Sequence, residues 1–306
     1  MIQFDSLNSA QLISPSVVTI GVFDGVHRGH QRLIKQLIEH GARHHLTPVV
    51  LTFFPYPEMI IHGSQPGYYV TLPARKAALL NGLGIEIVIT QPFNNEVRKI
   101  RAAAFVEQLK TNLRMASLWV GADFAMGYKR EGDIEFLRKA AMKHDFDLRI
   151  VDLMDAGGER VSSTRIRQAL AVGDVLEAAR LLGRPHRISG MVVRGAGRGR
   201  LIGVPTANLL FPVEQAIPSR GVYAARASVD GALIQCVVNI GVRPTFDGGG
   251  EQTVEAHLLD FAGDIYDHEI SLDFVSRLRD EKKFDGIDAL VAQIYKDIVE
   301  ARNSIT

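Results

Sequence analysis

Cysteine is almost absent from this chain of 306 residues, and neither sign of charge is in excess. The single cysteine, Cys236, excludes an intrachain disulfide, and because it lies in an apolar run we interpret it as a buried core thiol rather than a nucleophile. Lysine and arginine number 35 against 34 aspartates and glutamates, so the formal net charge is +1. This balance gives no long-range field suited to nucleic acid or to an anionic membrane. Any anion site must therefore be local.

Long apolar runs and zinc-binding motifs are missing as well. No stretch approaches the length of a membrane span, and the apolar run after the polar N-terminus is too short for a signal peptide. There is no HExxH arrangement and no cysteine cluster. We therefore expect a soluble, unprocessed protein of the cytoplasm that binds neither nucleic acid nor membrane. The sequence does not specify an oligomeric state.

The first half of the chain is an α/β pattern. Apolar strands of buried type alternate with amphipathic helices, which predicts a Rossmann-like, doubly wound parallel sheet with helices on both faces. Ligands of such sheets bind beyond the carboxyl ends of the strands. Loops 21–30, 52–57 and 121–127 follow strand ends, so we expect them to converge on one site. The strand candidates are Val17 to Ile20, Val49 to Phe53, Ile85 to Ile89, Leu118 to Val120 and Leu148 to Val151.

The second half has the pattern of an antiparallel β-domain. Asp230-Gly231 between two strand-like runs is a hairpin signal, and a small closed β-barrel would remove exposed strand edges. Helical spacing from Ile287 to Ile298 predicts a C-terminal helix that packs on the barrel. One hydrophobic core usually stops growing at about 250 to 300 residues. We therefore predict two domains, 1–183 and 184–306, with the boundary after Gly183.

The stretch from Gly21 to His30 has the features of a phosphate site. It follows an apolar strand, bears Gly21 and Gly25 for close backbone approach, and opens a helix whose first N–H groups and dipole favour anions. His27 and His30 face the same helix mouth. A metal site would need further ligands, and a pair of solvated surface histidines is the other alternative, although it leaves the glycines unexplained.

A second candidate phosphate contact is the run Ser162-Ser163-Thr164-Arg165-Ile166-Arg167. Hydroxyls at a helix start are first of all N-caps, and for any one of these residues capping is the favoured interpretation. The arginines at 165 and 167 add fixed charge at the helix end that already favours anions, which makes a phosphate contact plausible.

The glycine-rich segment 194–208 is neither a Walker loop nor a Rossmann fingerprint, because no Gly-Lys-Ser/Thr follows and Pro205 stops a helix. It is either a flexible basic turn or an anion cradle of backbone amides with Arg198 and Arg200 nearby. Thr206 and Asn208 offer the hard oxygen ligands that suit Mg²⁺ together with substrate phosphate.

These motifs also resemble a known family. Residues 21–30 look like the signature of the nucleotidylyltransferase superfamily, and 162–167 look like its second phosphate motif. The HxGH element alone would equally fit pantetheine-phosphate or nicotinate-mononucleotide adenylyltransferases. Together with the TFxP loop, the GADFxxG loop and the GxPTAN run 203–208, the pattern is similar over nearly the whole chain to bacterial bifunctional riboflavin kinase/FMN adenylyltransferase, also called FAD synthetase.

The resemblance implies that the first domain transfers AMP from ATP to FMN without a covalent enzyme intermediate. His27 and His30 would contact the ATP phosphates and the charge that develops on the transferred group. The motif at 162–167 would bind the β- and γ-phosphates. The ATP-binding residues implied for this domain are Gly21, Phe23, Asp24, Gly25, Gly29, Asp123, Ser162, Ser163, Thr164, Arg165 and Arg167.

For the second domain the resemblance implies phosphorylation of riboflavin by Mg-ATP. Glu255 would be the general base for the riboflavin 5′-hydroxyl, with Asp260 and Glu251 as competitors, and Arg279 would lie near the flavin. Mg²⁺ would be held through ATP by Thr206 and Asn208. The ATP-binding residues implied for the kinase are Gly197, Gly199, Gly203, Pro205, Thr206 and Asn208.

Four positions depart from the family pattern. Tyr56 stands where histidine is usual, Met126 where phenylalanine is usual, Val204 where phenylalanine or isoleucine is common, and Asp267 where glycine follows a tyrosine. The small molecules expected as substrates and products are ATP, riboflavin, FMN and FAD. Two other interpretations compete: an adenylyltransferase for another mononucleotide with the barrel as an appendage, and a non-catalytic flavin or nucleotide sensor.

Overall fold

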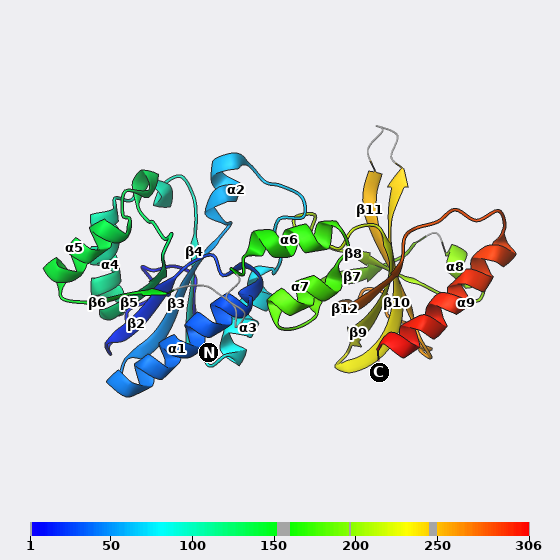
Figure 1. The fold of residues 1–306 in the computed structure, drawn as a ribbon, viewed down its shortest axis with the longest axis horizontal. Coiled ribbons are helices and arrows are strands. Elements are labelled where there is room, and N and C mark those ends of the chain that lie inside the picture. The colour runs from blue at the N-terminus through cyan, green and yellow to red at the C-terminus, as the bar shows by residue number, and fades with distance from the viewer. Residues whose placement is uncertain (1, 152–159, 196, 245–249, 306) are drawn as a thin grey trace. The chain divides into compact units, whose positions relative to one another are not determined.

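The computed structural model describes residues 2–151, 160–195, 197–244 and 250–305. By its internal contacts the chain divides into two compact units (Figure 1). The first unit comprises residues 1–65 and 72–162, and the second comprises residues 66–71 and 163–306. Each unit is described by itself. No helix among the described residues has the length and apolar character needed to cross a membrane.

The first unit is built on a six-stranded parallel sheet in the order β1-β4-β3-β2-β5-β6, as the alternating pattern predicts. The short strand β1 was not predicted, because three exposed or half-buried residues carry no periodic signal. The strands are β1 Ile2–Phe4, β2 Ser16–Ile20, β3 Thr47–Phe54, β4 Ile87–Pro92, β5 Met115–Gly121 and β6 Asp147–Val151. Its helices are α1 Arg28–His44, α2 Pro57–His62, α3 Pro73–Gly82, α4 Ala102–Leu113 and α5 Ile134–His144, with 3-10 helices η1 Asp24–Val26, η2 Val97–Lys99 and η3 Tyr128–Arg130.

Hydrophobic clusters cover both faces of this sheet. Val18 packs with side chains of α4 and α5, whereas its neighbour Val17 packs with side chains of α1 and α3. This alternation is the period-two signature of a strand that is buried on both faces. The chain leaves β2 toward β3 and β4 and later returns to β2's other side with β5, so the strand order reverses between β2 and β5. Ligands of doubly wound sheets bind at that crevice, and the loops after β2 and β5 flank it.

The second unit is a closed antiparallel barrel in the order β10-β11-β8-β7-β12-β9, which confirms the predicted barrel. The predicted hairpin at Asp230-Gly231 joins β9 to β10, with both residues in the left-handed region at φ 48° and 85°. The strands are β7 His186–Val193, β8 Ala207–Leu210, β9 Gly221–Val229, β10 Ala232–Pro244, β11 Gly250–Leu258 and β12 Glu269–Arg279. The helices are α6 Ser163–Ala171, α7 Val175–Leu182, α8 Arg198–Leu201 and α9 Ile287–Ser304.

Three segments pack on the barrel. The C-terminal helix α9 covers β9 and β10 through Ala301 and through Ile305 just after its end, as predicted. Helix α7 inserts Val175 into the hydrophobic cluster of the barrel. The strap 66–71 pairs with the segment before β9, where the Tyr69 N–H donates to the carbonyl of Glu214 over 2.8 Å. Residues 163–182 and 66–71 are therefore part of the barrel unit in folding terms, whereas the predicted division of activities after residue 183 stays a prediction.

Candidate active sites

The loop after β2 has an unusual backbone. Phe23, Gly25 and Val26 all adopt left-handed φ values, of 51°, 78° and 41°. For residues with a side chain, and above all for a β-branched valine, such a conformation costs about 1 to 3 kcal/mol and persists only where surrounding contacts hold it. The loop then enters α1, whose N-cap is His27. The Nδ1 atom of His27 accepts the backbone N–H of His30 over 3.4 Å.

The two histidines of the motif lie together at this helix start. Their rings stack with centroids 3.6 Å apart and planes 16° apart, and the Phe23 ring lies 5.0 Å from that of His30. Burial, then His27, then Lys76 lower the pKa of His30 well below its usual value. Within the described part of the chain, the Nδ1 atom of His30 is buried and lacks a hydrogen-bond partner. The site thus presents an uncharged imidazole with unused hydrogen-bonding capacity at a helix N-terminus.

A buried polar layer supports this loop, and its cation was not among the predicted site residues. Lys76 of α3 is 1% exposed, and its ammonium donates to the Val22 carbonyl over 3.0 Å and to the Thr52 hydroxyl over 2.8 Å. The Tyr56 ring lies 4.8 Å from the ammonium, and the Tyr56 hydroxyl donates to the buried Asp24 carboxylate over 3.1 Å. The sequence does contain a signal for Lys76, because this lysine stands among the apolar positions of an amphipathic helix.

The remaining predicted residues of this loop pack against their neighbours, and their contacts with ATP stay a prediction. A Cβ at Gly21 would lie 3.2 Å from the Phe23 ring, and Gly29 is buried in the first turn of α1. Tyr56, the departure from the usual histidine, is 2% exposed and holds Asp24 in place. Asp24 therefore links the loop to the buried polar layer that supports it.

The loop after β5 places Asp123 at the surface. Its carboxylate pairs with Arg160, and its carbonyl accepts from the Arg130 guanidinium over 3.1 Å. Met126, the second departure, is 8% exposed and packs in the core of the first unit, where its backbone exchanges hydrogen bonds with Gly132. Methionine in place of the usual phenylalanine at this position therefore alters how the core of the first unit packs.

The second phosphate motif spans the point in the sequence where the first unit ends and the second begins. Ser162 is the last residue of the first unit, and Ser163 begins α6 in the second. Arg165 forms an ion pair with Glu177 of α7 at 2.9 Å. Arg167 donates to the Thr164 hydroxyl over 3.2 Å and stacks on the Tyr68 ring at 4.4 Å. Both arginines are therefore held in place by side chains of the barrel unit.

In the barrel, the predicted kinase residues lie side by side on neighbouring strands. Glu255 of β11 pairs in register with Asn208 of β8 on one side and with Asn239 of β10 on the other. The Thr206 hydroxyl donates to the Glu255 carboxylate over 3.4 Å. Of the competitors for the base, Asp260 is exposed and forms an ion pair with Arg302 at 2.8 Å, and the side chain of Glu251 lies outside the described residues.

The glycine-rich segment packs tightly where it approaches these residues. A Cβ at Gly195 would lie 2.3 Å from the Asn208 amide nitrogen, and one at Gly199 would lie 2.3 Å from the Val204 carbonyl. Gly197 and Gly203 are in the left-handed region, at φ 69° and 77°. The side chains of Arg198 and Arg200, expected beside the cradle, lie outside the described residues.

Three further features lie in this segment or at residues outside it. Val204, the third departure, is a buried residue with 4% exposure. His257 Nδ1 donates to the Pro205 carbonyl over 2.8 Å, which holds the chain just before Thr206. The turn at Asp267 has a φ of 61°, as expected where the family has glycine, and aspartate tolerates this conformation better than most residues.

A pocket of about 850 Å³ lies within the second unit. Glu281 lines it and also lies against β10, because a Cβ at Gly241 would be 2.9 Å from the Glu281 carboxylate and 3.5 Å from the Asn239 amide. The pocket therefore adjoins the row that contains Glu255. Its lining comprises Pro66, Gly67, Arg167, Leu170, Ala171, Ala216, Ile217, Ser219, Arg220, Gln252, Arg277, Asp280 and Glu281.

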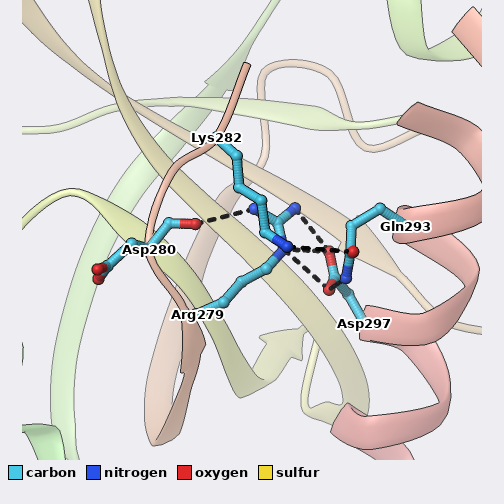
Figure 2. Close-up of polar contacts among 5 residues, drawn as sticks. All are labelled: Arg279, Asp280, Lys282, Gln293 and Asp297. Atoms are coloured by element: carbon cyan, nitrogen blue, oxygen red, sulfur yellow. Dashed lines mark hydrogen bonds and ion pairs between the residues drawn. The ribbon is translucent and has the colours of Figure 1, made fainter. Parts of the chain in front are cut away.

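Arg279, expected near the flavin, is engaged in a network with α9 (Figure 2). Its guanidinium makes two-pronged contacts of 2.8 to 3.0 Å with Asp297, whose side chain is 3% exposed. Gln293 donates to Asp297 over 2.8 Å and accepts from Lys282 over 3.4 Å. Arg279 also donates to the Asp280 carbonyl over 2.9 Å. The network ties the loop that carries Asp280 and Glu281 to the helix.

Two family models match the chain: that of FAD synthetase over residues 9–165 and that of riboflavin kinase over residues 182–305. The bifunctional riboflavin kinase/FMN adenylyltransferase of Pseudomonas fluorescens is 40% identical over 287 residues, which cover 94% of this chain and 92% of that protein. Its counterpart in Escherichia coli K12 is 40% identical, with 94% and 91% covered, and that in Bacillus subtilis is 36% identical, with the same shares covered.

The chain belongs to the bifunctional riboflavin kinase/FMN adenylyltransferase family. It is an enzyme with the family's two activities, ATP-dependent conversion of riboflavin to FMN and adenylyl transfer from ATP to FMN. The family resemblance inferred from the sequence motifs is thereby confirmed. A crystal structure from Streptococcus pneumoniae, described as a macrolide-efflux protein, is 32% identical and superimposes with a TM-score of 0.90, covering 99% of this chain and 98% of that one.

Proposed function

We propose that the two reactions occur at separate sites, the kinase reaction at the Glu255 row of the barrel and the adenylyl transfer at the loop after β2. The register of Asn208, Glu255 and Asn239 supports the first assignment, because it places a carboxylate beside amide and hydroxyl oxygens next to a large pocket. The stacked histidines at the start of α1 support the second. We further propose residues 1–183 and 184–306 as the division of activities, and the cytoplasm as the location, which cell fractionation would test.

In the proposed kinase reaction, Glu255 accepts the proton of the riboflavin 5′-hydroxyl as this oxygen attacks the γ-phosphorus of ATP and ADP leaves. The donor set fits Mg²⁺, since the Thr206 hydroxyl and the Asn208 carboxamide offer hard oxygen ligands beside the Glu255 carboxylate. When bound, this ion neutralises charge on the ATP phosphates. Thr206 and Asn208 would hold it through ATP, and the glycine-rich segment 197–205 would approach the phosphates.

We assign the flavin to the pocket that Asp280 and Glu281 line. Arg279 then acts indirectly, because its guanidinium is bound to Asp297 and to the Asp280 carbonyl. It holds the loop that borders the pocket.

In the proposed adenylyl transfer, a phosphate oxygen of FMN attacks the α-phosphorus of ATP and pyrophosphate leaves. No protein group forms a covalent bond, so catalysis consists of positioning and charge stabilisation. His27 and His30 contact the transferred phosphoryl group at the α1 N-terminus. Ser162, Ser163, Thr164, Arg165 and Arg167 bind the β- and γ-phosphates, and the loop that carries Asp123 lies near the nucleotide.

The test is a time course with purified protein, riboflavin, ATP and Mg²⁺, in which flavins are separated by chromatography. We expect FMN to appear first and FAD to follow, and FMN supplied alone with Mg-ATP to give FAD. FAD formation without any phosphorylation of riboflavin would favour a monofunctional adenylyltransferase. Flavin binding without turnover would favour a sensor.

A further inference from the structure

The left-handed loop that carries the adenylyl-transfer motif needs an anchor. Phe23 and Val26 occupy a strained conformation, and the Val22 carbonyl between β2 and these residues is held by two donors. One donor is the Thr52 hydroxyl, at 3.0 Å, and the other is the ammonium of Lys76, at 3.0 Å. Since strained backbone persists only where its surroundings hold it, these two donors are candidates for keeping the loop in place.

Burying the charge of Lys76 costs more free energy than is needed to hold one carbonyl in place. Its side chain is 1% exposed, and both hydrogen-bond acceptors of its ammonium are neutral oxygens. Burial lowers its pKa to about 8, and the nearby Asp24 raises it. A neutral donor could have held the same carbonyl without the desolvation of a charge. The retained charge is explained if it serves the anionic groups that the loop receives.

We propose that Lys76 is a positioning residue for adenylyl transfer, which fixes loop 21–27 in its phosphate-receiving conformation and supplies a buried positive charge close to His30. This inference rests on the proposed role of His27 and His30. The groups that face His30 with charge or titratable protons are His27 of the loop and Lys76 of α3, and Asp24 of η1 with Tyr56 before α2 complete the layer around Lys76. Lys76 itself touches no reacting atom.

The experiment removes the charge in two ways. Lys76→Met removes both charge and hydrogen bonds, whereas Lys76→Gln keeps a donor of similar reach. Lys35→Met is the matched control, because Lys35 is an exposed lysine further along α1. The single tryptophan, Trp119, is buried in β5 of the same unit, so its emission reports whether that unit is folded. All assays run at a temperature at which this emission is native.

We expect Lys76→Met to lower the kcat of FAD formation from FMN by about 10- to 100-fold, the range seen when a residue that orients a metal ligand through a hydrogen bond is lost. Lys76→Gln keeps a hydrogen-bond donor, so it should hold loop 21–27 better than Lys76→Met does. It should not restore the part of the rate that depends on the positive charge. In both variants the pH-rate limb that His30 controls should move to higher pH, because a cation that lowers its pKa is gone. Riboflavin phosphorylation should match wild type in all three variants.

The inference is overturned if both Lys76 variants form FAD as fast as Lys35→Met, or if the rate falls with an unmoved pH limb. His30→Ala separates this failure from failure of the proposed function. If His30→Ala leaves FAD formation intact, the assignment of the site is wrong. If His30→Ala is impaired while the Lys76 variants are not, only the role of Lys76 is wrong.

Discussion

At the scale of single residues, the proposed kinase base is the clearest target. Glu255→Ala should lower riboflavin phosphorylation by about 10²- to 10⁴-fold, the usual contribution of a general base. FAD formation from supplied FMN should survive, because Glu255 lies in the barrel unit and the histidine pair in the other. Both rates are measured on the same preparation by chromatography of the flavins. Equal loss of both activities would contradict the assignment.

The corresponding residue of the first unit is His30. Its pKa is depressed and its Nδ1 is buried, so it is suited to stabilise charge through hydrogen bonds rather than as a fixed cation. His30→Ala should suppress FAD formation by about 10²- to 10³-fold, as for the loss of one donor to a developing anion. Initial rates of FMN and FAD formation provide the measurement. FMN formation from riboflavin serves as the internal control.

The third residue is His186, whose burial leads us to predict that the barrel unit loses stability in acid. It is 1% exposed and donates through Nε2 to the Ala216 carbonyl over 2.9 Å, and burial lowers its pKa from 6.5 to about 4. Between these two values the unfolded chain binds a proton that the folded barrel does not, so stability falls as pH is lowered through this window. At about 1.4 kcal/mol per pKa unit, the loss from pH 7.5 to pH 5 is about 2 kcal/mol.

His186→Gln should abolish this part of the acid loss, because glutamine can still donate to Ala216 but does not titrate in this range. Calorimetric unfolding at pH 7.5 and pH 5 would follow the transition that accompanies loss of kinase activity. The same acid loss in variant and wild type would show that other groups cause it.

At the scale of elements, helix α9 acts through its ion pair with the last residue of β12. The side chains of Arg279 and Asp297 are 15% and 3% exposed, and removing one partner of such a buried pair typically costs about 3 to 5 kcal/mol. Asp297→Asn keeps the shape of the side chain, so we expect the free energy of unfolding to fall by an amount near the lower end of this range. Because the pair holds the loop at the pocket, the KM for riboflavin should rise more than the KM for ATP.

Asp260→Asn is the matched control for this prediction. Asp260 also pairs with α9, through Arg302, but the two side chains are 74% and 44% exposed. Exposed pairs contribute at most about 1 kcal/mol, so both KM values should stay near wild type. An equal rise of the two KM values in Asp297→Asn would indicate general loosening of the barrel instead of an effect on the pocket.

At the scale of the whole molecule, folding units and the proposed division of activities do not share a boundary. Helix α7 buries Val175, Leu181 and Leu182, and its first residue joins the barrel core. A fragment 184–306 keeps the Glu255 row and should phosphorylate riboflavin, but with a raised KM for riboflavin, because it lacks Arg167, Leu170 and Ala171 of the pocket. It should also melt at least about 10 °C below fragment 163–306, because each buried side chain is worth about 1.5 to 3 kcal/mol. We expect fragment 1–183 to form FAD from FMN.

Circular dichroism melts and the two assays test this division. Similar melting temperatures for the two barrel fragments would show that α6 and α7 do not stabilise the barrel. Adenylyl transfer by a barrel fragment, or riboflavin phosphorylation by 1–183, would contradict the proposed boundary.

Local periodicity and ordered motifs such as Gly21 to His30 and Gly203 to Asn208 were enough to predict the α/β pattern, the barrel, the terminal helix and the family. Which side chains meet became apparent from the fold alone. The burial of Lys76 beneath the β2 loop, the register of Asn239 with Glu255 and the capture of Arg279 by Asp297 join residues far apart in the chain. Such contacts depend on strand order, register and helix packing, which no local pattern encodes.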